Sequence, residues 1–124
     1  MLAAYDALAT VAVKSLAGAR KFYEGKLNFK VVHTEGDLAV TYQSGKSQLL
    51  VYQSQFAGTN RATAATWMVK DVEGLVKDLK ARGVSFEHYN MPGVTLMGDV
   101  HIAGKLKNAW FKDPDGNILA LVGQ

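Results

Sequence analysis

The sequence predicts an α+β domain built from two βαβββ modules that form one curled mixed sheet. Three observations lead to this fold class: an internal repeat, a helix-capping residue after the first strand of each copy, and several strand-like runs after each helix. With 124 residues, the chain has the length of one ordinary domain with its own core. We therefore expect a single domain over residues 1–124.

The internal repeat places residues 9–21 on residues 65–77, with six of the thirteen positions identical. This offset predicts module one at about 5–53, a polar connector at about 54–63 and module two at about 64–124. Each copy starts with a β-rich run, 8–14 or 64–70, that ends at Ser15 or Asp71. Both are good N-cap residues because a side-chain oxygen can accept from the first amides of a helix. Each module is therefore expected to begin as strand, cap and helix.

The helices are predicted from apolar residues at helical spacing. These residues are Leu16, Ala19, Phe22, Tyr23 and Leu27 in module one, and Val72, Leu75, Val76 and Leu79 in module two. Gly83 is placed to end the second helix, with Lys80 and Arg82 against the negative end of its dipole.

Three strands are expected after each helix, at Phe29–His33, Leu38–Tyr42 and Gln48–Tyr52, and at Val84–His88, Asn108–Lys112 and Ile118–Val122. The turns between them are expected at Glu35–Asp37, Ser44–Lys46 and Asp113–Gly116, where Gly or Pro-Asp-Gly suits a tight turn. Residues 90–99 form the longest segment expected to be irregular.

Composition excludes several classes of protein. The chain has no cysteine, so a disulfide framework, a thiolate zinc site and a cysteine nucleophile are ruled out. The net charge of +3 comes from scattered cations without a basic and aromatic strip, which argues against nucleic-acid binding. No apolar run reaches the roughly 20 residues of a membrane span, and the first residues do not form a signal peptide. We expect a cytoplasmic protein that does not bind membranes.

Two motifs, together with the repeat, resemble the vicinal oxygen chelate superfamily. They are Leu16-x5-Phe22-Tyr23-x3-Leu27-Asn28-Phe29 and the run Trp110–Asn117. This superfamily includes glyoxalase I, the extradiol dioxygenases, and the bleomycin and fosfomycin resistance proteins. Tyr89–Gly93 further resembles a segment of its small members of unassigned function. The resemblance covers essentially the whole chain and implies a homodimer with small-molecule clefts near its interface.

Enzymes of this superfamily hold a divalent metal with His, Gln or Glu side chains. Carried over one at a time, the ligand positions fall on Leu8, Leu50, Ala64 and Ala120. Aliphatic side chains offer no lone pair to a metal. The resemblance therefore implies a site without metal or other cofactor, and neither glyoxalase I nor dioxygenase activity is expected.

The cleft between the modules is the expected binding site. Alternation along the strands, with a bulge at Gly116, brings one set of residues to it. The set comprises Leu8, Thr10, Leu50, Tyr52, Thr66, Asn108, Trp110 and Ala120. Met91 and Met97 are expected either as an adaptable lid over this cleft or as contacts with a partner subunit. Trp110 has the alternative interpretation of a plain core residue.

The three histidines lie in different segments. His33 and His88 are expected to be structural, whereas Asp99 and His101, two residues apart, form a candidate acid–base or metal pair on one side of an extended chain.

Three functions follow. The leading hypothesis is a metal-free, resistance- or sequestration-type protein that binds a small, partly aromatic or apolar molecule. The alternatives are a metal-independent isomerase or lyase using His101, Asp99 and Tyr52, and a regulatory domain with a vestigial cleft. The ligand, and whether the modules pair within one chain or across a dimer, stay open.

Overall fold

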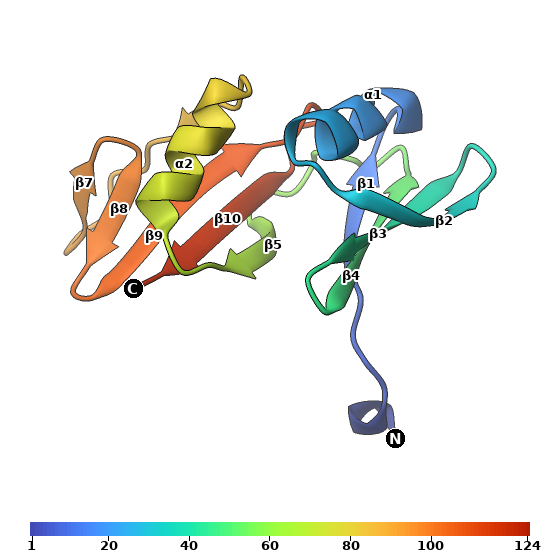
Figure 1. The fold of residues 1–124 in the computed structure, drawn as a ribbon, viewed down its shortest axis with the longest axis horizontal. Helices are drawn as coiled ribbons and strands as arrows, with labels where there is room; N and C mark the ends of the chain where they lie inside the picture. Colours follow the sequence, from blue (N-terminus) through green and yellow to red (C-terminus); the bar gives the residue numbers. More distant parts are fainter.

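The computed structural model describes residues 1–124 and has the predicted α+β architecture (Figure 1). Module one follows a short 3-10 turn, η1 (Leu2–Ala4). Its elements are β1 (Ala9–Val13), α1 (Leu16–Arg20), the π-helical continuation η2 (Lys21–Lys26), β2 (Lys30–Glu35), β3 (Ala39–Ser44) and β4 (Ser47–Gln53). The strand order is β1-β4-β3-β2, with β1 parallel to β4 and the other pairs antiparallel.

Module two has the same plan with one additional hairpin. Its elements are β5 (Thr63–Met68), α2 (Val72–Ala81), β6 (Phe86–Glu87), β7 (Thr95–Met97), β8 (Val100–Ala103), β9 (Leu106–Lys112) and β10 (Ile118–Gly123). The strand order is β5-β10-β9-β8-β7, and β6 also pairs with β9. The expectation of an irregular segment over 90–99 is therefore wrong in its second half. There Gly98, at φ 63°, turns the chain so that β7 pairs back onto β8.

Both helices begin, and the second helix ends, where the sequence predicts. Ser15 accepts a hydrogen bond from the amide of Gly18 at 3.2 Å, and Asp71 accepts one from the amide of Gly74 at 3.0 Å. Gly83 adopts φ 89° just after α2, a conformation open to glycine without strain. The first helix ends before Asn28, at φ 64°.

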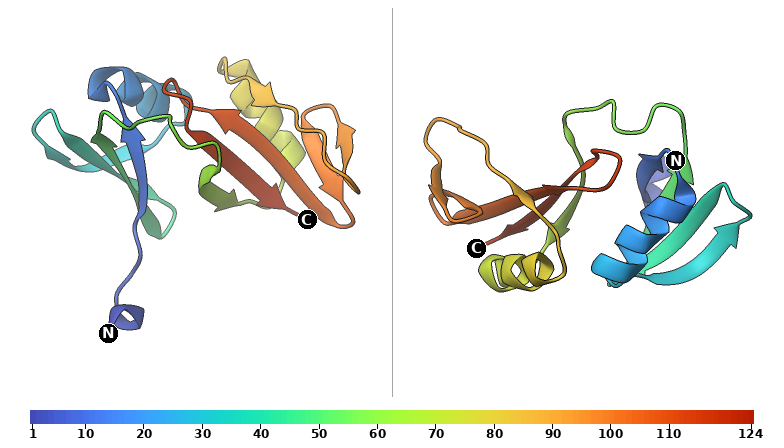
Figure 2. Two further views of the ribbon diagram at one scale, coloured as in Figure 1. Left: turned by 180° about the vertical axis from the view of Figure 1, so that it is seen from behind. Right: turned by 90° about the horizontal axis from the view of Figure 1, so that it is seen from above.

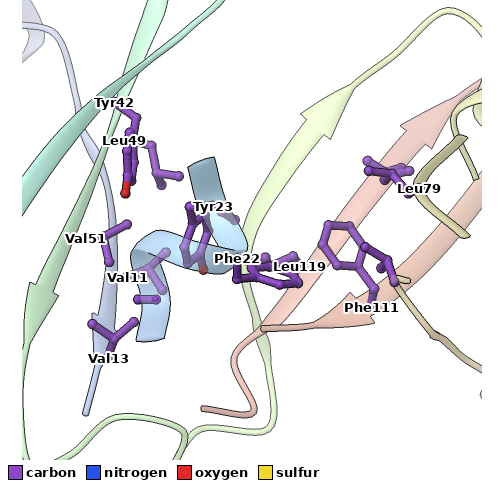
Figure 3. Packing of buried hydrophobic residues seen from close by; sticks show 14 of the residues in the cluster. Val11, Val13, Phe22, Tyr23, Tyr42, Leu49, Val51, Leu79, Phe111 and Leu119 are labelled. Carbon is purple, nitrogen blue, oxygen red and sulfur yellow. The ribbon is translucent and has the colours of Figure 1, made fainter. Parts of the chain in front are cut away.

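Both helices lie on the same side of the two sheets (Figure 2, right). Alternate strand residues face the helices and form one core that spans both modules, as Figure 3 shows for Val11, Leu49, Phe111 and Leu119. The residues between them point to the other side. We call that side of both sheets the open face.

The two sheets are not closed into the curled sheet that we expected. β1 and β5 of the same chain lie side by side where the modules meet, but no backbone ladder joins them, and the sheets stay separate. Without that ladder, the modules are held together by side-chain contacts, by the β9–β10 turn and by the connector.

The Asp113 carboxylate makes the central contact between the modules. Its Oδ2 accepts from the Tyr23 hydroxyl of module one at 2.8 Å and from Asn117 Nδ2 at 2.8 Å. Its Oδ1 accepts from the amides of Asp115 and Asn117 at 3.0 and 2.9 Å, which shapes the β9–β10 turn. Burial, and then the negative charge of Asp113, raise the pKa of Tyr23 well above its ordinary value, so this hydroxyl stays a donor.

The same turn also contacts module one through backbone groups. Asn117 Nδ2 donates to the Ala12 carbonyl at 2.6 Å, and Asp115 accepts from the Lys14 amide at 3.1 Å. The connector packs onto the turn, because a Cβ atom added to Gly58 would collide with the Asp115 carbonyl oxygen. The β9–β10 turn thus touches β1, the first helix and the connector.

We expect Asp113→Ala to lower the free energy of unfolding by about 3 kcal/mol or more, because it leaves several buried donors without an acceptor. The matched control is Asp115→Ala in the same turn, whose carboxylate accepts one exposed amide; its cost should be below about 1 kcal/mol. Urea unfolding of the two variants measures the difference. Equal costs would show that the Asp113 network does not join the modules.

Candidate functional site

The open face carries the four positions that the sequence analysis compared with metal ligands. Thr10 pairs with Leu50 in module one, and Thr66 pairs with Ala120 in module two. Leu8 and Ala64 each lie two residues before the threonine, so the four aliphatic residues occupy matching places in the two modules. These side chains do not fit a divalent cation because they have no donor atom. No three His, Cys, Asp or Glu side chains gather anywhere to hold one.

Trp110 lies over the position of Ala120. The two residues pair across β9 and β10, and the indole Nε1 donates to Thr63 Oγ1 at 3.2 Å. Thr63 belongs to β5 on the far side of β10, so the indole extends across β10. This explains why Ala120 and Ile118, on the open face, are only 2% and 8% exposed. Trp110 itself is half-buried, so part of its ring remains accessible on this face.

Tyr89, His101 and Trp110 form an aromatic cluster on the same face. The ring centroids of His101 and Trp110 are 4.8 Å apart, those of Tyr89 and Trp110 5.4 Å, and those of Tyr89 and His101 6.0 Å. The Tyr89 and His101 rings are tilted by 32° to each other, and both stand steeply on the indole plane, at 73° and 78°. Edge-to-face contacts of this kind are a favourable geometry for aromatic pairs.

This cluster contains two buried polar atoms that have no hydrogen-bond partner, Tyr89 Oη and His101 Nδ1. They are the only such side-chain atoms in the protein. The backbone amide of Tyr89 donates to His101 Nε2 at 2.9 Å, so Nε2 is an acceptor and Nδ1 carries the hydrogen. A buried donor without a partner costs about 1–3 kcal/mol. The cluster therefore presents a donor that the protein itself does not satisfy.

An ion pair borders the cluster. Glu87, which pairs with Trp110 across β6 and β9, binds Lys112 Nζ at 3.1 Å. Burial raises the pKa of Tyr89; the charge of Glu87 adds to this effect and that of Lys112 opposes it. The hydroxyl of Tyr89 accordingly stays protonated at neutral pH.

Module one contributes a second aromatic ring to the open face. Tyr52 is 38% exposed and lies between Ala12 on β1 and Ala39 on β3. Leu50 similarly lies between Thr10 and Thr41, so small side chains surround both residues.

In module two, Asn108 is the neighbour of His101 across β8 and β9. Thus the open face holds Leu8, Thr10, Leu50 and Tyr52 in one module and Thr66, Asn108, Trp110 and Ala120 in the other.

The structure does not join Asp99 to His101. The Asp99 oxygens bind Lys80 Nζ at 2.6 Å and His88 Nε2 at 2.7 Å, whereas His101 bonds to the Tyr89 amide. Asp99 lies in the β7–β8 turn beside α2, and so the strand alternation used to pair it with His101 does not apply. Tyr52 is in the other module. These three residues are therefore not assembled into an acid–base group.

Met97 is not part of a lid over the open face. It pairs with Val100, a core residue on the side of the helices, and its side chain is 62% exposed. Because β7 alternates, Leu96 instead shares the open face with its partner His101. Met91 lies half-buried in a turn closed by the Val94 amide at 3.2 Å from the Met91 carbonyl.

A wholly apolar pocket of about 130 Å³ lies on the helix side, where the modules meet. Eight side chains line it, namely Leu27, Phe29, Trp67, Val69, Leu75, Leu79, Phe111 and Leu121. Sequence reasoning placed the cleft on the open face and did not anticipate this pocket, which depends on how the two modules pack.

Sequence reasoning also missed Tyr89 and Leu96 as residues of the open face. Tyr89 was noted only within a family-like segment, and alternation back from His101 through a two-residue turn would have pointed to Leu96. Nothing in the sequence indicates that the Tyr89 amide bonds to His101.

Replacing Tyr89 with Phe removes a buried hydroxyl that has no partner. We expect the Tyr89→Phe variant to be as stable as the wild type or more stable by up to about 1 kcal/mol. The same substitution at Tyr23, whose hydroxyl donates to Asp113, should destabilise the protein by about 1–2 kcal/mol. Thermal and urea unfolding compare the pair; a clear loss of stability in Tyr89→Phe would mean that this hydroxyl is satisfied.

The Lys80 ammonium, and after it His88, hold the pKa of Asp99 below its usual range. A lowered pKa in the folded state adds stability above about pH 4, and that stability is lost as the pH falls further. Asp99→Asn should therefore lower stability at neutral pH by about 0.5–1 kcal/mol, a small effect because both partners are exposed.

The gap between Asp99→Asn and the wild type should narrow between pH 5 and about pH 3, as Asp99 becomes protonated. Asp78→Asn on the exposed side of α2, where no ion pair forms, is the control and should follow the wild type. Unfolding series at several pH values test this, and a gap that stays constant with pH would contradict the ion pairing.

Comparisons with known proteins agree with this fold. No curated protein sequence matches the chain significantly. A glyoxalase family protein from Enterococcus faecalis has a similar structure, with a TM-score of 0.73 at 19% identity over 98% of this chain and 99% of that one. Lactoylglutathione lyase from Agrobacterium tumefaciens has a TM-score of 0.70 at 16% identity, covering 96% and 92%.

The genomically encoded fosfomycin resistance protein of Listeria monocytogenes has a TM-score of 0.71 at 13% identity, covering 97% of this chain and 93% of that one. At such identities, these likenesses concern the fold alone. The family model of the Glyoxalase/Bleomycin resistance protein/Dioxygenase superfamily matches residues 6–121, nearly the whole chain. The chain belongs to the glyoxalase/bleomycin resistance protein/dioxygenase superfamily.

Proposed function

We propose that this protein binds a small, partly aromatic or apolar molecule on its open face without a metal ion. One feature supports the proposal: the positions that the resemblance aligns with metal ligands of family enzymes are Leu8, Leu50, Ala64 and Ala120, and the indole of Trp110 lies over the last of them. The chemistry of these side chains suits apolar contact and not cation binding.

The other features of the open face support the same function. Tyr52 and Trp110 expose flat ring surface beside small residues, an arrangement that favours a planar ligand. His101 and Tyr89 add polar atoms without partners, which is how apolar sites usually orient a ligand. The likeness in fold to a fosfomycin resistance protein is compatible with a resistance- or sequestration-type role.

We further propose that the protein is a homodimer whose second copy covers part of this face. Large apolar side chains are exposed on the strands and along the N-terminal segment that projects from the fold in Figure 1, including Leu8, Tyr52, Met68 and Leu96. Exposed apolar surface of this kind is typical of an interaction surface.

The proposal is tested on the purified protein with three probes, naphthalene, 2-naphthamide and 2-naphthoate. At least one of them should raise the melting temperature, since a ligand that prefers the folded state stabilises it. Zinc, nickel or manganese alone should leave the melting temperature unchanged. Native mass spectrometry of the protein as purified reports bound metal and the number of subunits.

Trp110→Ala should weaken binding of the probe by about tenfold or more, because it removes the ring that covers β10. The matched control is Trp67→Phe, which changes the only other tryptophan, on the helix side. A stoichiometric metal in the native spectrum, or no stabilisation by any probe, would overturn the proposed function; the latter result fits a vestigial cleft.

A further inference from the structure

We propose that His101 Nδ1 is the polar anchor of this site and that it takes the carbonyl oxygen of an uncharged, flat aromatic ligand. The inference rests on the proposed function and names the class of molecule that the open face selects. Its basis is the pair of buried atoms without partners, Tyr89 Oη and His101 Nδ1, within the cluster around Trp110.

The role of His101 as a donor follows from its hydrogen bond to the backbone. The Tyr89 amide reaches Nε2 at 2.9 Å, so a hydrogen on Nε2 would set two donors against each other. The remaining hydrogen of the neutral ring therefore sits on Nδ1. The ring is completely buried, and no acceptor of the protein faces this hydrogen. A ligand that brings an acceptor would complete its hydrogen bonding.

The charges near the cluster favour an uncharged acceptor. Glu87 and Lys112 form an ion pair on the open face, so neither is a free countercharge for an anion. The negative charge of Glu87 raises the pKa of Tyr89 more than the positive charge of Lys112 lowers it. The net effect of the two charges at this hydroxyl therefore disfavours a second negative charge, such as that of a carboxylate. A carbonyl or amide oxygen accepts the Nδ1 hydrogen without bringing a charge into this site.

The Tyr89 side chain occupies the place that we assign to the ligand. Its phenol ring contacts both Trp110 and His101, and the Nδ1 atom of His101 is buried in this cluster. Rotation of this side chain leaves the amide of Tyr89 on Nε2, so His101 keeps the same hydrogen on Nδ1. The move also brings Oη, which has no partner when buried, into contact with water. A flat ligand ring can then take the place of the phenol ring against the indole of Trp110. The ligand would thereby select the conformation in which the Tyr89 side chain has rotated away.

The experiment compares 2-naphthamide, naphthalene and 2-naphthoate on the Trp67→Phe protein, in which Trp110 is the only tryptophan. Quenching of Trp110 emission reports each affinity. We expect 2-naphthamide to bind about tenfold more tightly than either of the other two probes. In His101→Phe this preference should disappear, whereas the matched variant His88→Phe, altered at an exposed histidine on the helix side, should keep it.

A second measurement avoids reliance on the buried variant. In protein with ¹⁵N-labelled histidine, the His101 signals are assigned by elimination with His33→Gln and His88→Gln. The Nδ1–H signal of His101 should shift with 2-naphthamide and stay in place with naphthalene.

Equal affinities for 2-naphthamide and naphthalene, or tightest binding of 2-naphthoate, would overturn the anchor while leaving binding on the open face intact. A His101 Nδ1–H signal that ignores 2-naphthamide would do the same. No quenching by any of the three probes would instead overturn the proposed function itself.

Discussion

The Asp113 carboxylate lies where the two modules meet and accepts hydrogen bonds from both sides of that junction. Within module two it organises the β9–β10 turn by accepting from the amides of Asp115 and Asn117. Across the junction it accepts from the Tyr23 hydroxyl on the first helix. Because no backbone ladder joins β1 to β5, this buried network and the aromatic contacts around it decide how the modules are placed. The composition of the open face depends on that placement.

Aromatic side chains connect this junction to the core. Phe22 packs on Phe111 of module two, and Phe29 packs on Trp67, with ring centroids 6.3 and 5.8 Å apart. Trp67 also donates a hydrogen bond to Ser44 Oγ at 2.9 Å, so the junction combines these ring contacts with a polar contact between the modules. The helices and this packing lie on one side of the sheets, which leaves the other side without a helix. The fold therefore separates a helix side that holds the modules together from the open face on which we propose that a ligand binds.

The chain keeps the fold of its family, and the residues that the resemblance aligns with metal ligands, Leu8, Leu50, Ala64 and Ala120, are all aliphatic. The pairing of Thr10 with Leu50 in module one corresponds to the pairing of Thr66 with Ala120 in module two. In the function that we propose, these aliphatic side chains offer apolar surface to a ligand and no donor atom to a metal. The His101 ring is a polar group of the open face. Its Nε2 accepts a hydrogen bond from a backbone amide, and its Nδ1 has no partner in the protein.

Local patterns in the sequence were enough to predict several parts of the fold. The 56-residue repeat, the caps at Ser15 and Asp71 and the Asp113–Gly116 turn identified the modules' first strands, their helices and the last hairpin, because each signal arises within a few neighbouring residues. Alternation along the strands also brought Thr10, Leu50, Thr66 and Trp110 to one face. The resemblance to the family identified the four aliphatic positions.

The way in which distant segments meet depends on tertiary packing and could not be predicted from local patterns. The tertiary structure separated Asp99 from His101, turned Met97 toward the helix side and brought Tyr89 onto His101 and Trp110. It also left the two sheets unclosed and formed an apolar pocket between the modules. These outcomes depend on a two-residue turn, on hydrogen bonds between residues far apart in the chain and on the packing of two modules against each other. Local periodicity cannot predict such contacts. It indicates on which face of a strand or helix a residue lies, but not which other segment packs against that face.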